Sequence, residues 1–172
     1  SGNCATMAGF LAARGTGTIS TKYGKAEDMV LSMQVVLPNG DIIRTPAVPS
    51  HSSGPEFGKI FLGAEGTLGV ITEATMQIDH MPETRLLRAV LFDDLSQALE
   101  AGRRMMVNRL DPLVIRLYDE HSTRTRVRSI LGYEMDGAYM VIGFDGFEEI
   151  ATAQEKRAMD ICDELGAQDL GR

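Results

Sequence analysis

The sequence predicts an α+β protein, and three observations support this fold class. After about residue 83, short β-branched apolar stretches alternate with longer helical stretches, which is typical of helices packed on a sheet. In the first half, an apolar stretch at 29–37 is followed by a turn signal and a short returning strand at 42–45. A glycine-rich loop at 63–69 then runs into a third apolar strand, 68–78, whose alternation indicates a half-buried surface.

Turn-forming residues define the remaining elements of the first half. The segment 38–41, Pro-Asn-Gly-Asp, is a strong hairpin signal. Residues 46–55, rich in Pro and Ser, are expected to form a loop, and residues 55–61 a short helix with Pro55 in its first turn. Residues 1–18 are rich in Gly, Ala and Thr and show little periodicity, so we expect loop and short turns there.

The second half is expected to begin at a boundary near 80–83 and to alternate between strands and helices. The predicted strands are 86–92, 113–118 and 138–144, and the predicted helices are 95–108, 120–130 and 148–165. No further element is expected after the last helix. This open end, together with a first residue that is not Met, indicates a fragment of a longer protein.

The composition argues against several classes of protein. A formal net charge of −7 disfavours binding to nucleic acid and to anionic membrane surfaces, because both favour basic faces. No apolar run approaches the roughly 20 residues that a membrane span needs. Cys4 and Cys162 match no metal or redox spacing, which indicates reduced thiols in a cytoplasmic protein. The His residues also lack metal-ligand spacing, so no metal site is expected.

The glycine-rich loop at 63–69 is the strongest candidate for a ligand site. Glycine lets the main chain approach a flat or charged ligand closely, and the strand after the loop would hold its N–H groups in place. The loop lacks the Lys and the spacing of a phosphate-binding P-loop, and it does not have the strand-loop-helix order of a dinucleotide fingerprint. From the residues alone, a tight bulged turn leading into a core strand explains the loop equally well.

Several motifs in a fixed order are more specific than this loop alone. In chain order they are Ser20–Val30, Val35–Gly40, Ser53–Glu56, Leu62–Ala74 and Thr75–Ile78. The series resembles the second half of the FAD-binding domain in the vanillyl-alcohol-oxidase, or PCMH-type, flavoenzymes. Within that superfamily it is most similar to alkyldihydroxyacetonephosphate synthase and related FAD-linked oxidases. The resemblance is continuous from about Gly9 to Pro82 and looser in the C-terminal half.

This resemblance implies two domains and a flavin cofactor. Residues 1–82 would form the second subdomain of the FAD-binding domain, and residues 83–172 the start of an α+β, ferredoxin-like cap domain. The implied protein is an FAD-dependent, alkyldihydroxyacetonephosphate-synthase-like enzyme that acts on a small anionic substrate, with a homodimer as its expected assembly. Two alternatives stay open. One is an FAD-dependent 2-hydroxy-acid dehydrogenase of the glycolate or D-lactate type, and the other is an inactive folded fragment without bound cofactor.

The resemblance also implies that FAD contacts two segments and one strand residue. These are Ala12, Ala13, Arg14 and Gly15; Gly63, Ala64, Glu65, Gly66, Thr67, Leu68 and Gly69; and the main chain of Ile71. The Glu65 carboxylate invites a role as general base. We favour a structural role, in which this carboxylate accepts backbone N–H bonds and holds the loop in shape.

Arg116 is the candidate substrate residue. It places a permanent cation in the apolar strand 113–118, where it must face solvent, pair with a carboxylate or bind an anion. Strand alternation puts Arg116 on the same face as Val114 and Tyr118. In the resembled synthases the matching Arg belongs to the active site, whereas an acidic residue is commoner here in the 2-hydroxy-acid dehydrogenases. The resemblance therefore implies that Arg116 binds the anionic group of the substrate.

Overall fold

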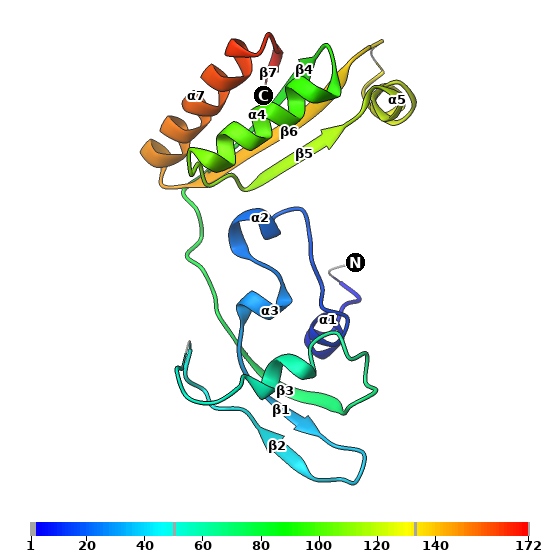
Figure 1. The fold of residues 1–172 in the computed structure, drawn as a ribbon, viewed down its shortest axis with the longest axis vertical. Helices are drawn as coiled ribbons and strands as arrows, with labels where there is room; N and C mark the ends of the chain where they lie inside the picture. The colour runs from blue at the N-terminus through cyan, green and yellow to red at the C-terminus, as the bar shows by residue number, and fades with distance from the viewer. Residues whose placement is uncertain (1–2, 50, 133, 172) are drawn as a thin grey trace. The chain divides into compact units, whose positions relative to one another are not determined.

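The computed structural model describes residues 3–49, 51–132 and 134–171. The chain divides into two units, Ser1–Asp79 and His80–Arg172 (Figure 1). Both units combine helices with an antiparallel sheet, which confirms the predicted α+β class. The domain assignment with a boundary after residue 82 stays a prediction. Outside the described residues lie Ser1, Gly2, Ser50, Tyr133 and Arg172, and with them parts of the loops expected at 1–18 and 46–55.

A three-stranded antiparallel sheet lies at the centre of the first unit, in the order β2-β1-β3. Its strands are β1 (Val30–Val36), β2 (Ile42–Arg44) and β3 (Val70–Met76). The first two form the predicted hairpin, and its turn uses a positive φ of 88° at Gly40, a conformation that favours glycine. All three predicted strands are confirmed, each slightly shorter than expected.

Short helices complete the first unit: α1 (Met7–Ala12), α2 (Ser20–Tyr23), α3 (Ala26–Met29) and the 3-10 helix η1 (Phe57–Ile60). The expectation of loop and turns over residues 1–18 was wrong for α1. The Thr6 hydroxyl caps this helix by accepting a hydrogen bond from the N–H of Gly9 at 3.1 Å. Leu11 is fully buried in a core that includes Val35 and Ile71, so packing stabilises a helix too short to show periodicity.

The second unit is built on a four-stranded antiparallel sheet in the order β5-β6-β4-β7. Its strands are β4 (Thr84–Phe92), β5 (Val114–Tyr118), β6 (Ala138–Gly146) and β7 (Gln168–Gly171). The expectation that no element follows the last helix was wrong, because β7 pairs with β4. This strand is short and polar, and it is held by its partner strand and by Arg88, whose guanidinium donates to the Asp169 carboxylate at 3.3 Å.

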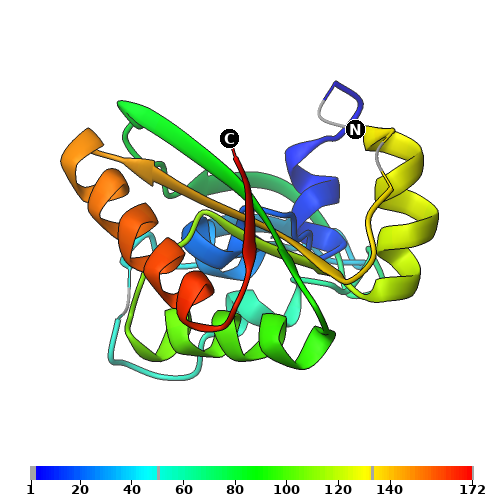
Figure 2. The same ribbon diagram turned by 90° about the horizontal axis from the view of Figure 1, so that it is seen from above.

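Helices α4 (Leu95–Val107) and α7 (Glu148–Glu164) pack against each other on one face of this sheet (Figure 2). The helix predicted at 120–130 is present as consecutive turns: α5 (Glu120–Ser122), the π-helical turn η2 (Thr123–Val127) and α6 (Arg128–Leu131). Among the described residues, no helix combines the length and the apolar character needed to cross a membrane.

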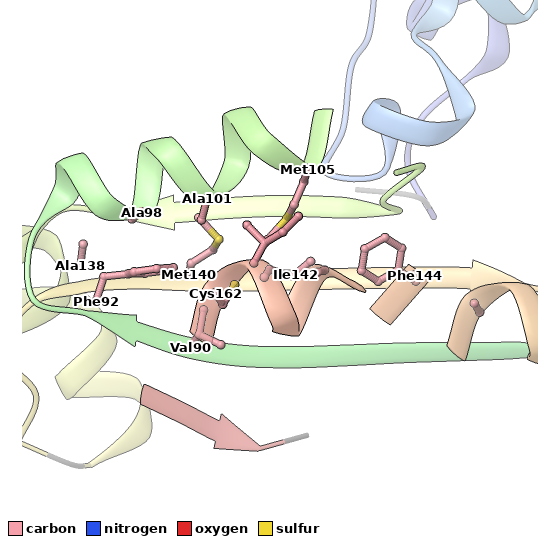
Figure 3. Packing of buried hydrophobic residues seen from close by; sticks show 13 residues of the cluster. Val90, Phe92, Ala98, Ala101, Met105, Ala138, Met140, Ile142, Phe144 and Cys162 are labelled. Atoms are coloured by element: carbon pink, nitrogen blue, oxygen red, sulfur yellow. The ribbon is translucent and has the colours of Figure 1, made fainter. Parts of the chain in front are cut away.

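The core of the second unit lies between the sheet and helices α4 and α7 (Figure 3). It includes Ala138, Met140, Ile142 and Phe144 from β6 and Ala98, Ala101 and Met105 from α4. Ile115 and Leu117 of β5 pack against the same cluster. Because side chains alternate along a strand, the other residues of β5 point to the opposite face of the sheet, away from α4 and α7. That face carries Arg116.

Candidate functional site

The two segments predicted to contact FAD lie side by side in the first unit. The N–H of Gly63 donates to the carbonyl oxygen of Leu11 at 3.2 Å, and the N–H of Glu65 donates to that of Ala12 at 3.1 Å. A Cβ added to Gly63 would lie 3.3 Å from the Cβ of Arg14. These hydrogen bonds join the end of α1 to the glycine-rich loop, so the main chain of the two segments forms one continuous surface.

Local contacts hold the glycine-rich loop in a defined shape. Gly63 and Gly66 have positive φ values of 77° and 82°, and the non-glycine residue Glu65 between them has 49°. Both the N–H and the hydroxyl of Thr67 donate to the Ala64 carbonyl, at 2.9 and 2.6 Å. At the end of the loop, a Cβ on Gly69 would lie 2.9 Å from the carbonyl oxygen of Val36, so only glycine fits against β1.

The expectation that the Glu65 carboxylate holds the loop was wrong. No hydrogen bond to this carboxylate is found among the described residues, and the side chain is exposed. Glu65 contributes through its main chain N–H, and Thr67 supplies the side-chain contact. A general base takes its proton from the substrate, so a general-base role for this exposed carboxylate stays an untested alternative.

Arg14 lies at the end of α1 in a left-handed conformation, with a φ of 54°. Its Nε donates to the Glu27 carboxylate at 3.0 Å, and Lys25 contacts the same carboxylate at 3.0 Å. The hydrogen bond from Lys25 is the largest cause of the lowered pKa of Glu27, and the charge of Arg14 adds to it. The guanidinium is therefore engaged within the first unit, and the segment 12–15 offers main chain rather than a free cation.

Gly15 and Ile71 have structural constraints of their own. A Cβ on Gly15 would lie 2.2 Å from the ring of Phe10, so any larger residue would displace that ring whether or not a ligand binds. The Ile71 side chain is 6% exposed and belongs to the core of the first unit. Any ligand contact at Ile71 would therefore use its main chain, and that contact stays a prediction.

The exposed part of the loop has the features that a flavin dinucleotide needs. A Cβ on Gly66 would meet nothing within 4 Å, so the loop is open on that side. Among the described residues, the N–H groups of Gly66 and Leu68 donate no hydrogen bond, which leaves them available to an anionic group. The glycine-rich main chain therefore fits FAD, and the segments 12–15 and 63–69 are the residues that would hold it.

Arg116 lies on β5, at one edge of the sheet of the second unit. The strand register pairs it with Val141 and pairs Tyr118 with Tyr139, which confirms that Arg116 and Tyr118 share a face. The side chain is exposed, and its Cζ lies 5.2 Å from the centroid of the Tyr118 ring. Within the described ranges, no carboxylate forms an ion pair with it.

Sequence reasoning missed the aromatic surroundings of Arg116. Alternation along β5 already placed Tyr118 beside it, but Tyr139 comes from another strand and needs the register to be found. The ion pair between Arg14 and Glu27 was also missed, because nothing in the sequence brings residues 13 positions apart together. No group of three or more His, Cys, Asp or Glu side chains in the described part of the chain could hold a metal ion.

Comparison with known families accounts for most of the chain. Residues 1–46 match a family described as "FAD binding domain", and residues 81–171 match "FAD linked oxidases, C-terminal domain". The chain belongs to the FAD-linked oxidase family. Both descriptions indicate FAD as the cofactor, which confirms the cofactor predicted from the sequence. The loop at 63–69 lies between the matched ranges, so its contact with FAD stays a prediction.

Individual relatives agree with this family. The chain is 30% identical over 188 residues to alkyldihydroxyacetonephosphate synthase of Trypanosoma brucei brucei, covering 96% of the chain and 30% of the relative. It is 32% identical over 121 residues to the mitochondrial D-lactate dehydrogenase [cytochrome] of Arabidopsis thaliana, covering 70% and 21%. A solved alkyldihydroxyacetonephosphate synthase matches the fold with a TM-score of 0.81 at 29% identity, covering 95% of the chain and 33% of that structure. The chain thus spans about a third of the synthases it matches.

Proposed function

We propose that this chain is part of an FAD-dependent enzyme that resembles alkyldihydroxyacetonephosphate synthase and acts on a small anionic substrate. The main support for the anionic substrate comes from Arg116. Its guanidinium is exposed on a β-strand and has no carboxylate partner among the described residues. An arginine that is permanently charged and not neutralised by the protein is suited to bind a phosphate or carboxylate. One relative that aligns with 96% of the chain, the synthase of Trypanosoma brucei brucei, has a phosphate group in its name.

The residues of the first and second units would have separate roles. The main chain of segments 12–15 and 63–69 would hold FAD, with the N–H groups of Gly66 and Leu68 directed at its anionic part. Bound FAD supplies a ring that accepts and returns electrons. Arg116 would bind the anionic group of the substrate and so fix the position of the reacting carbon.

An alternative of the same cofactor class is a 2-hydroxy-acid dehydrogenase. It is supported by the similarity to a D-lactate dehydrogenase and by the fact that the carboxylate of such an acid would also pair with Arg116. Both alternatives require an anion site, and Arg116 favours the synthase only through the resemblance, in which an acidic residue is commoner at this position in the 2-hydroxy-acid dehydrogenases. The two reactions differ in the flavin, because only the dehydrogenase passes electrons from a hydroxy acid to it.

The experiment that tests the proposal uses the protein encoded by the complete reading frame that contains these 172 residues. Its visible absorption spectrum is recorded before and after adding D-lactate, glycolate or an acyl dihydroxyacetone phosphate. Bleaching of the flavin by a hydroxy acid would support the dehydrogenase. A flavin that stays oxidised with hydroxy acids, while the acyl compound is converted, would support the synthase. A protein that binds no flavin would contradict both.

Substitution of Arg116 tests its assigned role in that protein. We expect Arg116→Ala to lower kcat/KM for the active anionic substrate by about tenfold or more, because a charge-assisted hydrogen bond contributes roughly 1.5–3 kcal/mol. Arg116→Lys retains the charge and should lose less. Unchanged kinetics in Arg116→Ala would show that the guanidinium does not bind substrate.

We also propose that the 172-residue chain by itself is inactive and carries no flavin, since it spans only about a third of the synthases it matches. Binding with part of the contacts still carries the full entropic cost of association. A yellow purified chain would contradict this. The cytoplasmic location and the homodimer stay predictions.

A further inference from the structure

An aromatic cluster lies beside Arg116 on the face of the sheet that points away from α4 and α7. The Arg116 Cζ lies 5.2 Å from the centroid of the Tyr118 ring, within the range of a cation–π interaction. The Tyr118 ring in turn lies 6.0 Å from that of Tyr139, tilted by 49°. Such a tilted pair is a favourable aromatic arrangement. The three side chains form a row of cation, ring and ring across two neighbouring strands.

The tyrosine pair is anchored where its two strands meet the following helix. Thr123 is fully buried in the π-helical turn, and its hydroxyl donates to the Tyr118 carbonyl at 3.4 Å and accepts from the Tyr139 N–H at 3.3 Å. Asp119, next to Tyr118, caps α5 by accepting from the N–H of Ser122 at 2.7 Å. The main chain that carries both rings is therefore tied to one helical segment.

The two rings differ in exposure, which suits them to different tasks. Tyr139 is 8% exposed and forms the fixed backing, whereas Tyr118 is half-buried between Tyr139 and the guanidinium. Burial raises the pKa of Tyr139, with a smaller effect from Tyr118, so its phenol stays neutral near pH 7. No phenolate forms there to compete with a ligand for the cation.

A guanidinium that lies over a ring keeps its N–H groups available. The ring attracts the cation through its face, while the donors lie in the guanidinium plane and remain free for an oxyanion. An arginine on an exposed strand otherwise samples many rotamers, and ordering it on binding weakens affinity. A protein that already holds the binding rotamer avoids this penalty.

We propose that Tyr118 is a positioning residue for Arg116. Its ring, packed against that of Tyr139 and carried by main chain hydrogen-bonded to Thr123, holds the guanidinium in the orientation that binds the anionic group of the substrate. The proposal rests on the proposed function, because it assumes that Arg116 binds that anion. It adds that affinity for the anion depends on the ring of Tyr118 and not on its hydroxyl.

The test measures binding of two defined oxyanions, inorganic phosphate and oxalate, to the full-length protein by isothermal titration calorimetry. We expect Tyr118→Leu to weaken binding of the preferred anion by about two- to fivefold, the size of one exposed cation–π interaction. Tyr118→Phe keeps the ring and should bind as the wild type does. Val114→Ala is the matched control, on the same strand and face but without contact to the ring, and it should also bind normally.

The outcomes separate this inference from the proposed function. If Arg116→Ala weakens anion binding while Tyr118→Leu binds like the wild type, the positioning role is overturned and the anion site stands. If Tyr118→Phe is as weak as Tyr118→Leu, the hydroxyl rather than the ring matters, which also overturns it. If neither anion binds the wild type, or Arg116→Ala binds as well as the wild type, the anion site itself fails. Steady-state kinetics give a second readout, since loss of positioning should raise KM with little change in kcat.

Discussion

Gly66 offers a direct test of the flavin assignment, because the effect of its substitution on the fold is small and can be worked out. Its φ of 82° is a conformation that L-residues adopt at a cost of about 1 kcal/mol. A Cβ there would meet nothing within 4 Å, so no steric clash within the protein is added. We therefore expect Gly66→Ala to lower the free energy of unfolding by about 1 kcal/mol.

The same methyl group would lie where the loop offers its free N–H groups. A ligand in contact with the main chain would be pushed away, so we expect Gly66→Ala to lose most of its flavin while staying folded. Gly66→Asn distinguishes the two effects, since Asn tolerates a positive φ yet still carries a side chain. Flavin content is measured from the visible absorption of the purified full-length protein, and stability from denaturant unfolding.

Gly102→Ala is the matched control for this experiment. A Cβ at Gly102 would also meet nothing within 4 Å, but this residue lies inside α4 with an ordinary helical backbone. Alanine there should raise the free energy of unfolding by up to about 1 kcal/mol and leave the flavin unchanged. Full flavin content in Gly66→Ala would refute the loop assignment. A loss of stability above about 3 kcal/mol would refute the reasoning from φ.

Three further predictions concern Cys162 and Glu155 of the second unit. Burial raises the pKa of Cys162 from 9.0 to about 12, so this thiol should resist alkylation at pH 8 while the exposed Cys4 reacts, as peptide mapping by mass spectrometry would show. Since the unfolded thiol ionises first, the stability that neutral Cys162 provides is complete below about pH 9 and is lost as the pH rises toward 12. Lys and Tyr side chains titrate over the same range, so the expected result is a melting temperature that falls more steeply in the wild type than in Cys162→Ala. Glu155 is buried and accepts from the Arg88 guanidinium at 2.9 Å, so Glu155→Ala should lower the free energy of unfolding by about 3 kcal/mol. A loss below about 1 kcal/mol in denaturant unfolding would mean that Asp169 alone satisfies the guanidinium.

The elements that the sequence predicted correctly are those with a strong local pattern. The hairpin around Gly40 has a turn signal, and α4 has Asp94 as a cap and a periodic apolar face that includes Ala98 and Met105. These features are encoded within a few neighbouring residues, so a single sequence is enough to find them.

The elements that were missed depend on residues far away in the chain. α1 is six residues long and contains Gly9, and it is stabilised by a cap and by burial of Leu11 against the sheet. β7 is polar and exists because β4 pairs with it. Local patterns carry no information on either contact.

In the candidate site, too, some features follow from the local sequence and others depend on distant parts of the chain. Residue type and spacing marked the glycine-rich loop and Arg116 as candidates, and their roles toward FAD and substrate come from the resemblance and stay predictions. The bonds that join Gly63 to Leu11 and Glu65 to Ala12, and the ring of Tyr139 behind Tyr118, could not, because they depend on how the chain folds back on itself.

The position of β4 also affects how the second unit forms during synthesis. Ala89 pairs with Val141 on one side and with Gly171 on the other, so both neighbours of this strand are made after it. Helices α4 and α7 can begin to form locally, but one edge of β4 has no partner until residue 171 has left the ribosome. During that interval the nascent chain presents an apolar strand with open hydrogen-bonding groups, which is the period in which it is most exposed to aggregation.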